Sequence, residues 1–272
     1  MKMTVFVGWS GSGGKEIAAR VRKFLNEFFK DRIVAKFSEQ ISAGDVWHTG
    51  LMKMLQKADY GLLCLTPKSE PSWLLYEAGI LSQTTLFNLD DNPGPHIVPI
   101  LFNVDSDILS KFGPLTHYQA CSFQLDAIWE LLRNINNASH DMTEARNASS
   151  QTFPRYLTPD EFEASWEKYR CAFKRDVCRL MCANDLELHL EPFALDMPSI
   201  GNTAGTGIPA LFKLGQTLVG ILRMDTATPD IWRKSFEKFR DTFEYVVSEE
   251  GLTPELAPIK KAIEELDKLF QS

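Results

Sequence analysis

The sequence predicts an α/β protein built on a parallel sheet and followed by a part made only of helices. In the first half of the 272 residues, short apolar runs alternate with amphipathic segments, which is typical of strand–helix repeats. The runs are continuously apolar, as expected for strands that are buried on both faces. The last third shows helical periodicity alone. Five strands in this rhythm indicate a flavodoxin-like doubly wound fold with strand order 2-1-3-4-5.

The predicted strands are short and rich in apolar residues. The run YGLLCL at residues 60–65 is apolar throughout and predicts a central strand. Pro99 is unfavourable inside a central strand, because proline has no N–H for the hydrogen-bond ladder. The five predicted strands are Thr4–Gly8, Ile33–Phe37, Tyr60–Leu65, Ile97–Phe102 and Gln119–Phe123.

Apolar residues that recur every three or four positions predict helices between these strands. The polar residues 137–157 are expected to form a loop. The sequence Thr158-Pro159-Asp160-Glu161 is a capping box with proline at the first helical position, and it predicts a helix that continues to about Met181. The other predicted helices of this part are Gly14–Phe29, Asp45–Lys57, Ser72–Leu86 with Ser72 as its cap, and Leu125–Asn136.

The sequence changes in character after this point, because residues 183–207 contain few apolar runs. We therefore expect a first domain at residues 1–181 and a helical C-terminal extension at residues 182–272. No pattern in the extension points to a chemistry, so packing or oligomerisation is its simplest role. Its predicted helices are Ile208–Met224, Pro229–Ser248 and Pro254–Phe270.

Composition excludes several classes of function. The formal net charge of −7 argues against a nucleic-acid-binding surface as the main function. No apolar run is long enough for a membrane span or a signal peptide, which predicts a cytoplasmic protein. The five cysteines form no CxxC pair and the histidines lack metal-ligand spacing, so we expect no metal site. Three cysteines on one helical face are expected to be reduced and packed in a core: Cys171, Cys178 and Cys182.

The opening loop, VFVGWSGSGGKE at residues 5–16, raises the question of phosphate binding. A P-loop requires Gly, four residues and then Gly-Lys-Ser/Thr, but that spacing places Trp9 at the first glycine and Glu16 at the hydroxyl. The dinucleotide fingerprint fails as well, because Glu16 occupies its third glycine position. Ligands of doubly wound folds bind at the carboxyl ends of the strands, where the strand order reverses. The loops after Gly8, Phe37 and Leu65 are therefore the expected site.

Several segments around these loops carry a resemblance to a known family. They are FSEQISAGDVW at 37–47, LTP at 65–67 and SWLLYEAG at 72–79, together with VFVGWSG at 5–11 and GPLTHYQ at 113–119. At these separations the chain resembles the Toll/interleukin-1 receptor (TIR) domains of bacterial anti-phage defence proteins over about residues 1–180. The resemblance implies the TIR variant of the flavodoxin-like fold and does not reach the helical extension.

The resemblance also implies a function and a site. It implies an NAD⁺ glycohydrolase that uses NAD⁺ as its substrate and needs no cofactor, with Glu77 as the catalytic residue. A homo-oligomer is implied, with a partner defence protein as an alternative trigger, and neither membrane nor nucleic acid is expected as a partner. A loop similar to the family's BB loop, which gates the site and contacts a neighbouring protomer, comprises Ile41, Ser42, Ala43, Gly44 and Asp45. The residues expected to line the substrate site are Gly8, Trp9, Ser10, Phe37, Ser38, Trp47 and Trp73.

The implied chemistry agrees with a site that has one carboxylate. Glycosidases use two carboxyl groups because the leaving alkoxide must be protonated. Nicotinamide leaves a cationic ring as a neutral molecule, so one carboxylate near the ribose is sufficient to stabilise the oxocarbenium-like transition state. The product is ADP-ribose or a cyclic isomer, and the sequence does not choose between them.

Other interpretations of the same residues stay open. Without the surrounding motif, Glu77 is more typical of a solvated glutamate at a helix start. Trp47 and Trp73 are equally typical of core aromatic residues. The whole chain is also compatible with a TIR adaptor that only assembles, or with a nucleoside deoxyribosyltransferase-like enzyme that ignores NAD⁺.

Overall fold

The chain folds into two compact units, Met1–Lys174 and Arg175–Ser272, each with its own packing. The computed structural model describes residues 2–30, 32–37, 47–87, 96–146, 156–195, 207–224 and 227–271. Ser38 and the BB-like loop, Ile41–Asp45, lie outside the described residues. Of Trp47, the structure describes the backbone but not the side chain.

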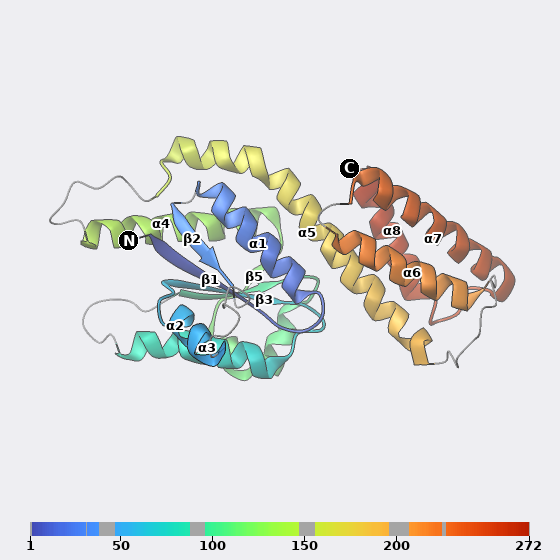
Figure 1. Ribbon diagram of the computed structural model, residues 1–272, viewed down its shortest axis with the longest axis horizontal. Coiled ribbons are helices and arrows are strands. Elements are labelled where there is room, and N and C mark those ends of the chain that lie inside the picture. Colours follow the sequence, from blue (N-terminus) through green and yellow to red (C-terminus); the bar gives the residue numbers. More distant parts are fainter. Residues whose placement is uncertain are drawn as a thin grey trace. The chain divides into compact units, whose positions relative to one another are not determined.

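The first unit is built on a five-stranded, all-parallel sheet with the order β2-β1-β3-β4-β5 (Figure 1). The predicted α/β class, with a flavodoxin-like parallel sheet in the strand order 2-1-3-4-5, is confirmed. The order reverses at β1, which pairs with β2 on one side and with β3 on the other. The strands are β1 (Met3–Trp9), β2 (Ile33–Lys36), β3 (Tyr60–Leu65), β4 (His96–Leu101) and β5 (Cys121–Ser122).

Helices cover both faces of this sheet (Figure 1). Three elements share one apolar cluster on one face: α2 (Trp47–Leu55), α3 (Pro71–Phe87) and the 3₁₀ segment η2 (Ser106–His117). On the other face lie α1 (Gly14–Phe28), α4 (Leu125–Arg146) and the first part of α5 (Pro159–Leu195). Stacked rings of Phe24 and Phe173, with centroids 3.8 Å apart, join α1 to α5.

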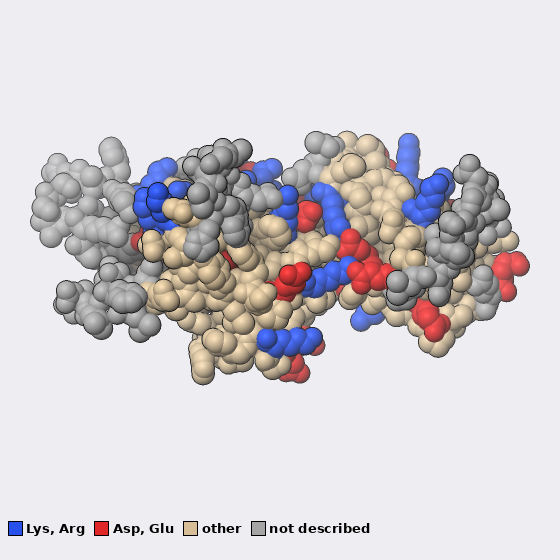
Figure 2. All heavy atoms as spheres, turned by 60° about the horizontal axis from the view of Figure 1, so that its bottom comes forward, with Lys and Arg blue, Asp and Glu red and all other residues tan. Residues whose placement is uncertain are grey.

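The surface of the first unit is poor in charge over one area. Figure 2 shows a broad area without Lys, Arg, Asp or Glu in the view that brings the α2–α3 side forward. Helix α3 contributes to this, because its one charged residue, Glu77, is fully buried. Such a face can pack against another protein at a low desolvation cost.

Pro99 is tolerated in β4 because its backbone nitrogen faces β5, which does not pair with β4 at this residue. The amide of Phe102 donates to Leu65 on β3, and the carbonyl of Leu101 accepts from Phe123 beyond β5. Residues of a parallel strand face its two neighbours alternately, so Pro99 belongs to the set that faces β5. Strand β5 pairs with β4 only from Ile100 onward, and no ladder bond is therefore lost at the proline.

The predicted loop at 137–157 is wrong in its first part, because α4 continues to Arg146. Ser139 is buried one turn after Ile135, so the inner stripe of the helix continues although most residues after Ile135 are polar. A solvated helix face was thus interpreted as a loop. The helix cap predicted at Ser72 is also wrong, because α3 begins at Pro71 and Ser72 lies within its first turn.

Helix α5 is longer than predicted and continues to Leu195. The predicted capping box is confirmed: Thr158 Oγ1 accepts from the Glu161 amide at 3.4 Å, and Glu161 Oε2 accepts from the Thr158 amide at 3.0 Å. The helix does not end near Met181, because Leu186 and Leu190 continue its apolar face. The division between the two compact units falls at 174/175, inside this helix, as does the expected boundary after residue 181.

The second unit consists of the end of α5 with α6 (Ile208–Arg223), α7 (Pro229–Glu250) and α8 (Ala257–Gln271). These four helices share one apolar core. Buried Arg179 donates to the carbonyls of Leu222 and Met224 at the end of α6, and its guanidinium lies 4.5 Å above the Trp232 ring. Within the described residues, no helix is both long and apolar enough to cross a membrane.

Candidate functional site

The glycine-rich opening loop is fastened to the loop that follows β3. Ser10 Oγ accepts from the Glu70 amide at 2.9 Å and donates to the Glu70 carbonyl at 3.0 Å. Gly11 has a φ of +73°, and a Cβ there would lie 1.8 Å from the Lys68 carbonyl oxygen. Glycine is required at this position because the two loops touch backbone to backbone. The loop composition therefore has a structural cause that does not involve phosphate.

Glu77 lies at the carboxyl end of β1, beside the reversal in strand order. A Cβ placed on Gly8 would be 2.4 Å from Glu77 Oε2, so the carboxyl occupies the space that a side chain at Gly8 would need. Gly8 is opposite Leu63 in the neighbouring strand β3, and Trp9 is opposite Cys64. The second turn of α3 thereby places a carboxyl directly over the end of the central strands.

The two oxygens of this carboxyl differ in their contacts. Trp73, one turn earlier on α3, donates its indole Nε1–H to Oε1 at 3.0 Å. Oε2 is buried and has no hydrogen-bond partner among the residues that the structure describes. A buried polar atom without a partner is costly and is frequently found where a ligand or a reacting group belongs.

The environment favours the neutral form of this carboxyl. Burial raises the pKa of Glu77 well above its usual value, and the hydrogen bond from Trp73 lowers it only in part. Burial also raises the pKa of the Cys64 thiol, and the nearby Glu77 raises it further. Because the Glu77 side chain is fully buried, its ionisation depends on the charges nearby, and a bound cationic group would favour the ionised form.

The structure brings together only some of the residues expected at the site. Gly8, Trp73 and Glu77 are in contact on the side of α3. The Trp9 side chain lies near the start of α1, 3.7 Å from where a Cβ on Gly14 would be, and its buried indole Nε1 has no hydrogen-bond partner in the described part of the chain. Phe37 follows β2 and is covered by the Arg22 guanidinium of α1 at 4.7 Å. These two aromatic residues thus pack towards α1 rather than towards Glu77.

Trp73 combines the two roles that the sequence left open. Its ring lies 5.7 Å from that of Tyr76 and packs against the apolar cluster of α2, α3 and η2. It also holds Glu77 by a hydrogen bond. Sequence analysis missed Cys64 as a neighbour of Glu77, although the register of β1 and β3 places it directly opposite Trp9. Only the packing of α3 against this edge brings Glu77 near enough to influence the pKa of Cys64.

No protein-family model and no curated protein matches this chain. Across the described residues, no group of three or more His, Cys, Asp or Glu side chains is arranged to hold a metal ion. The site is therefore characterised by its own geometry: one buried carboxyl, one indole donor and a glycine at a strand end.

Proposed function

We propose that this chain is a TIR-domain NAD⁺ glycohydrolase, which cleaves the bond between nicotinamide and ribose. The observation that carries the proposal is the placement of Glu77, held by Trp73 against Gly8 at the strand-order reversal. Doubly wound sheets bind their ligands at this place. The proposal includes a role in bacterial antiviral defence, which rests on the resemblance of the sequence segments around this site.

In the proposed reaction the C–N bond to the pyridinium breaks, and its electron pair leaves with nicotinamide, which becomes neutral. Positive charge then develops on the ribose, where an ionised Glu77 stabilises it. Water or an adenine nitrogen attacks the ribose carbon; water loses a proton to give ADP-ribose, and adenine gives a cyclic isomer. The cationic ring of the bound substrate would lower the raised pKa of Glu77 and so favour the reactive, ionised form.

The direct test is to incubate the purified full-length chain with NAD⁺ and to follow nicotinamide and the ribose-containing products by chromatography. We expect Glu77→Gln to reduce turnover by about 10²–10³, because glutamine retains the shape but not the charge. Glu167→Gln is the matched control, since Glu167 lies on the surface of α5, where it pairs with Arg170 one turn away.

The outcomes separate the alternatives. Normal turnover in a folded Glu77→Gln protein would end the proposed mechanism. An adaptor would consume no NAD⁺ at any protein concentration. A deoxyribosyltransferase-like enzyme would exchange bases between deoxynucleosides and leave NAD⁺ intact.

A further inference from the structure

A second candidate site lies away from Glu77, between α4 and the start of α5. It is a cavity of about 450 Å³, within the range of about 300–1,000 Å³ that is usual for small-molecule sites. Helix α4 starts at the carboxyl end of β5 and runs back along the sheet, and the start of α5 contacts Arg32, which directly precedes β2. The cavity therefore lies towards the amino edge of the sheet, whereas Glu77 lies at the carboxyl edge.

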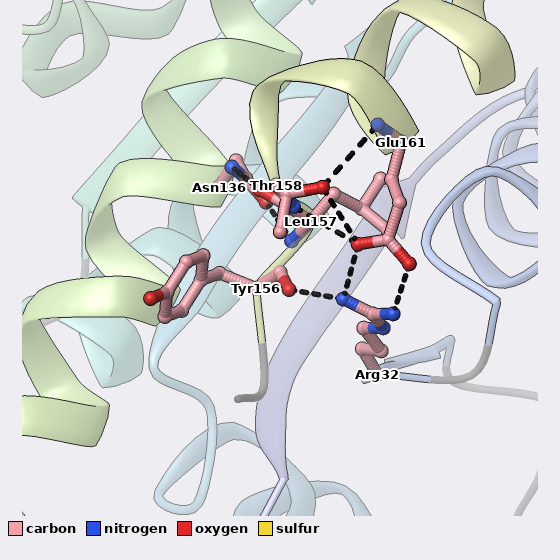
Figure 3. Close-up of polar contacts among 6 residues, drawn as sticks. All are labelled: Arg32, Asn136, Tyr156, Leu157, Thr158 and Glu161. Carbon is pink, nitrogen blue, oxygen red and sulfur yellow. Dashed lines mark hydrogen bonds and ion pairs between the residues drawn. The ribbon is translucent and has the colours of Figure 1, made fainter. Parts of the chain in front are cut away.

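One wall of this cavity is held in place by polar contacts (Figure 3). The Asn136 side chain bonds both backbone groups of Leu157, donating to its carbonyl at 2.9 Å and accepting from its amide at 2.8 Å. Arg32 donates to the Tyr156 carbonyl and to both oxygens of Glu161, at 2.9 and 2.5 Å. A wall fixed on both sides in this way retains its shape without a ligand, which lowers the entropic cost of binding.

Aromatic rings form much of the lining. Trp129 of α4 and Phe162 of α5 meet edge to face, with centroids 5.8 Å apart. His140 and Tyr156 form a second such pair at 4.4 Å. All four residues line the cavity, which suits a flat ring system better than an aliphatic chain.

The charges around the cavity nearly balance. Arg133 lines it, but its guanidinium pairs with Glu130 at 2.6 Å and covers the Trp129 ring. Glu163 lines the opposite side on α5, and the exposed amide of Asn137 supplies a donor and an acceptor. Because the one lining arginine is already paired and the lining glutamate is negative, a phosphate would gain little here.

We propose that this cavity binds a neutral, planar heteroaromatic molecule of nucleobase to nucleoside size. The aromatic pairs would contact the ring faces, and Asn137 would bond its polar edge. The inference rests on the lining alone and does not depend on the activity proposed for Glu77.

The test titrates the full-length chain with adenosine, nicotinamide and AMP in a calorimeter. We expect one-to-one binding of adenosine or nicotinamide with a Kd below about 1 mM, and weaker binding of AMP than of adenosine.

The substitution Asn137→Trp, at an exposed position, should fill the cavity and abolish this binding, while the circular dichroism spectrum and the melting temperature stay unchanged. Glu163→Lys should raise the affinity for AMP relative to adenosine by about tenfold or more, since it replaces repulsion by attraction. Glu167→Lys, one turn later on the same helix and outside the lining, should leave that ratio unchanged.

Three results would overturn the proposal. One is the absence of saturable binding of both neutral probes to the folded protein. Another is binding that survives Asn137→Trp, which would place the ligand elsewhere, for example near Glu77. The third is a wild-type preference for AMP over adenosine, which would exclude a site for neutral ligands.

Discussion

Glu77 combines two properties that are seldom found together at a purely structural residue. It is the only charged residue of α3, and it is fully buried. One oxygen accepts a hydrogen bond from the Trp73 indole, and the other, which lies above Gly8, has no hydrogen-bond partner among the described residues. A glutamate that served only the helix start would be solvated, so the interpretation as a helix-dipole residue does not agree with its burial.

The raised pKa of Glu77 predicts a definite dependence of stability on pH. The unfolded carboxyl ionises near its usual pKa of about 4.5, while the folded carboxyl resists ionisation. Stability contributed by the neutral group is therefore complete below about pH 4.5 and is lost as the pH rises towards the folded pKa. Glu77→Gln removes this loss, so the melting temperature of the variant should gain on the wild type between pH 4 and pH 8. A difference in melting temperature that stays constant over this range would contradict a buried, neutral Glu77.

The contact between Gly8 and Glu77 can be tested by a double-mutant cycle. Gly8→Ala would place its Cβ 2.4 Å from Glu77 Oε2 and 2.7 Å from Leu63 Cδ2, which should cost about 1–3 kcal/mol of unfolding free energy. In a Glu77→Ala background one of these clashes is absent, so the cost should fall by at least about 0.5 kcal/mol. Denaturant titration measures both values, and strictly additive costs would show that the two residues do not touch. Gly79→Ala, on the same helix as Glu77, is the control, because a Cβ at Gly79 would meet no atom of the described residues within 4 Å.

At the scale of elements, the start of α5 is fixed both by its own capping box and by a contact with the residue before strand β2. The capping box closes the helix on itself, while Arg32 joins it to the strand β2 that begins one residue later. The hydrogen bond from the Thr158 backbone, followed by that from Arg32, lowers the pKa of Glu161 to about 2.

Glu161→Gln should therefore destabilise the first unit in a pH-dependent manner. Loss of the cap and of a partly exposed ion pair should cost about 1–2 kcal/mol at neutral pH. The contribution of the wild-type carboxylate is complete above its unfolded pKa of about 4.5 and is lost as the pH falls through about 2. Wild type and variant should thus converge near pH 2 in denaturant titrations. Glu167→Gln should show no such convergence, and an equal difference at pH 7 and pH 2 would refute the assigned role of the ionised carboxylate.

The whole molecule joins two separately packed units through one helix. The second unit has a core of its own, and the first has a charge-poor face over the helix that carries Glu77 (Figure 2). The segment Ile41–Asp45, which follows β2 in the chain, resembles in sequence the BB loop through which TIR proteins contact a neighbouring protomer. These features together favour an activity that depends on assembly.

We accordingly expect NAD⁺ cleavage per molecule to rise steeply with protein concentration, because a site completed by a neighbour forms only after association. The measurement pairs initial rates with light scattering across a dilution series. Full specific activity in a sample that scattering shows to be monomeric would contradict the expectation. An unrelated protein at the same mass concentration controls for crowding.

Some features of this chain follow from local physical chemistry and could be predicted from the sequence. Strands such as YGLLCL at 60–65 are apolar throughout because helices cover both faces, and that pattern is visible without a structure. The capping box at Thr158 is equally local, since both of its hydrogen bonds connect residues three apart. Strand order 2-1-3-4-5 followed from the alternation of elements, because few topologies connect such repeats.

Other features depend on contacts between distant residues, and only the tertiary structure decided them. The length of α4 and α5 was missed, because a helix with one buried stripe and polar remaining faces resembles a loop in composition. The sequence named Glu77 as a candidate, but not its burial, its free oxygen or its contact with Gly8, which lies 69 positions earlier in the chain. The cavity between α4 and α5 likewise left no local signal, since its walls come from residues 129–140 and 156–163. Periodicity reports which face of an element is buried, whereas the partner that buries it is determined only when the whole chain packs.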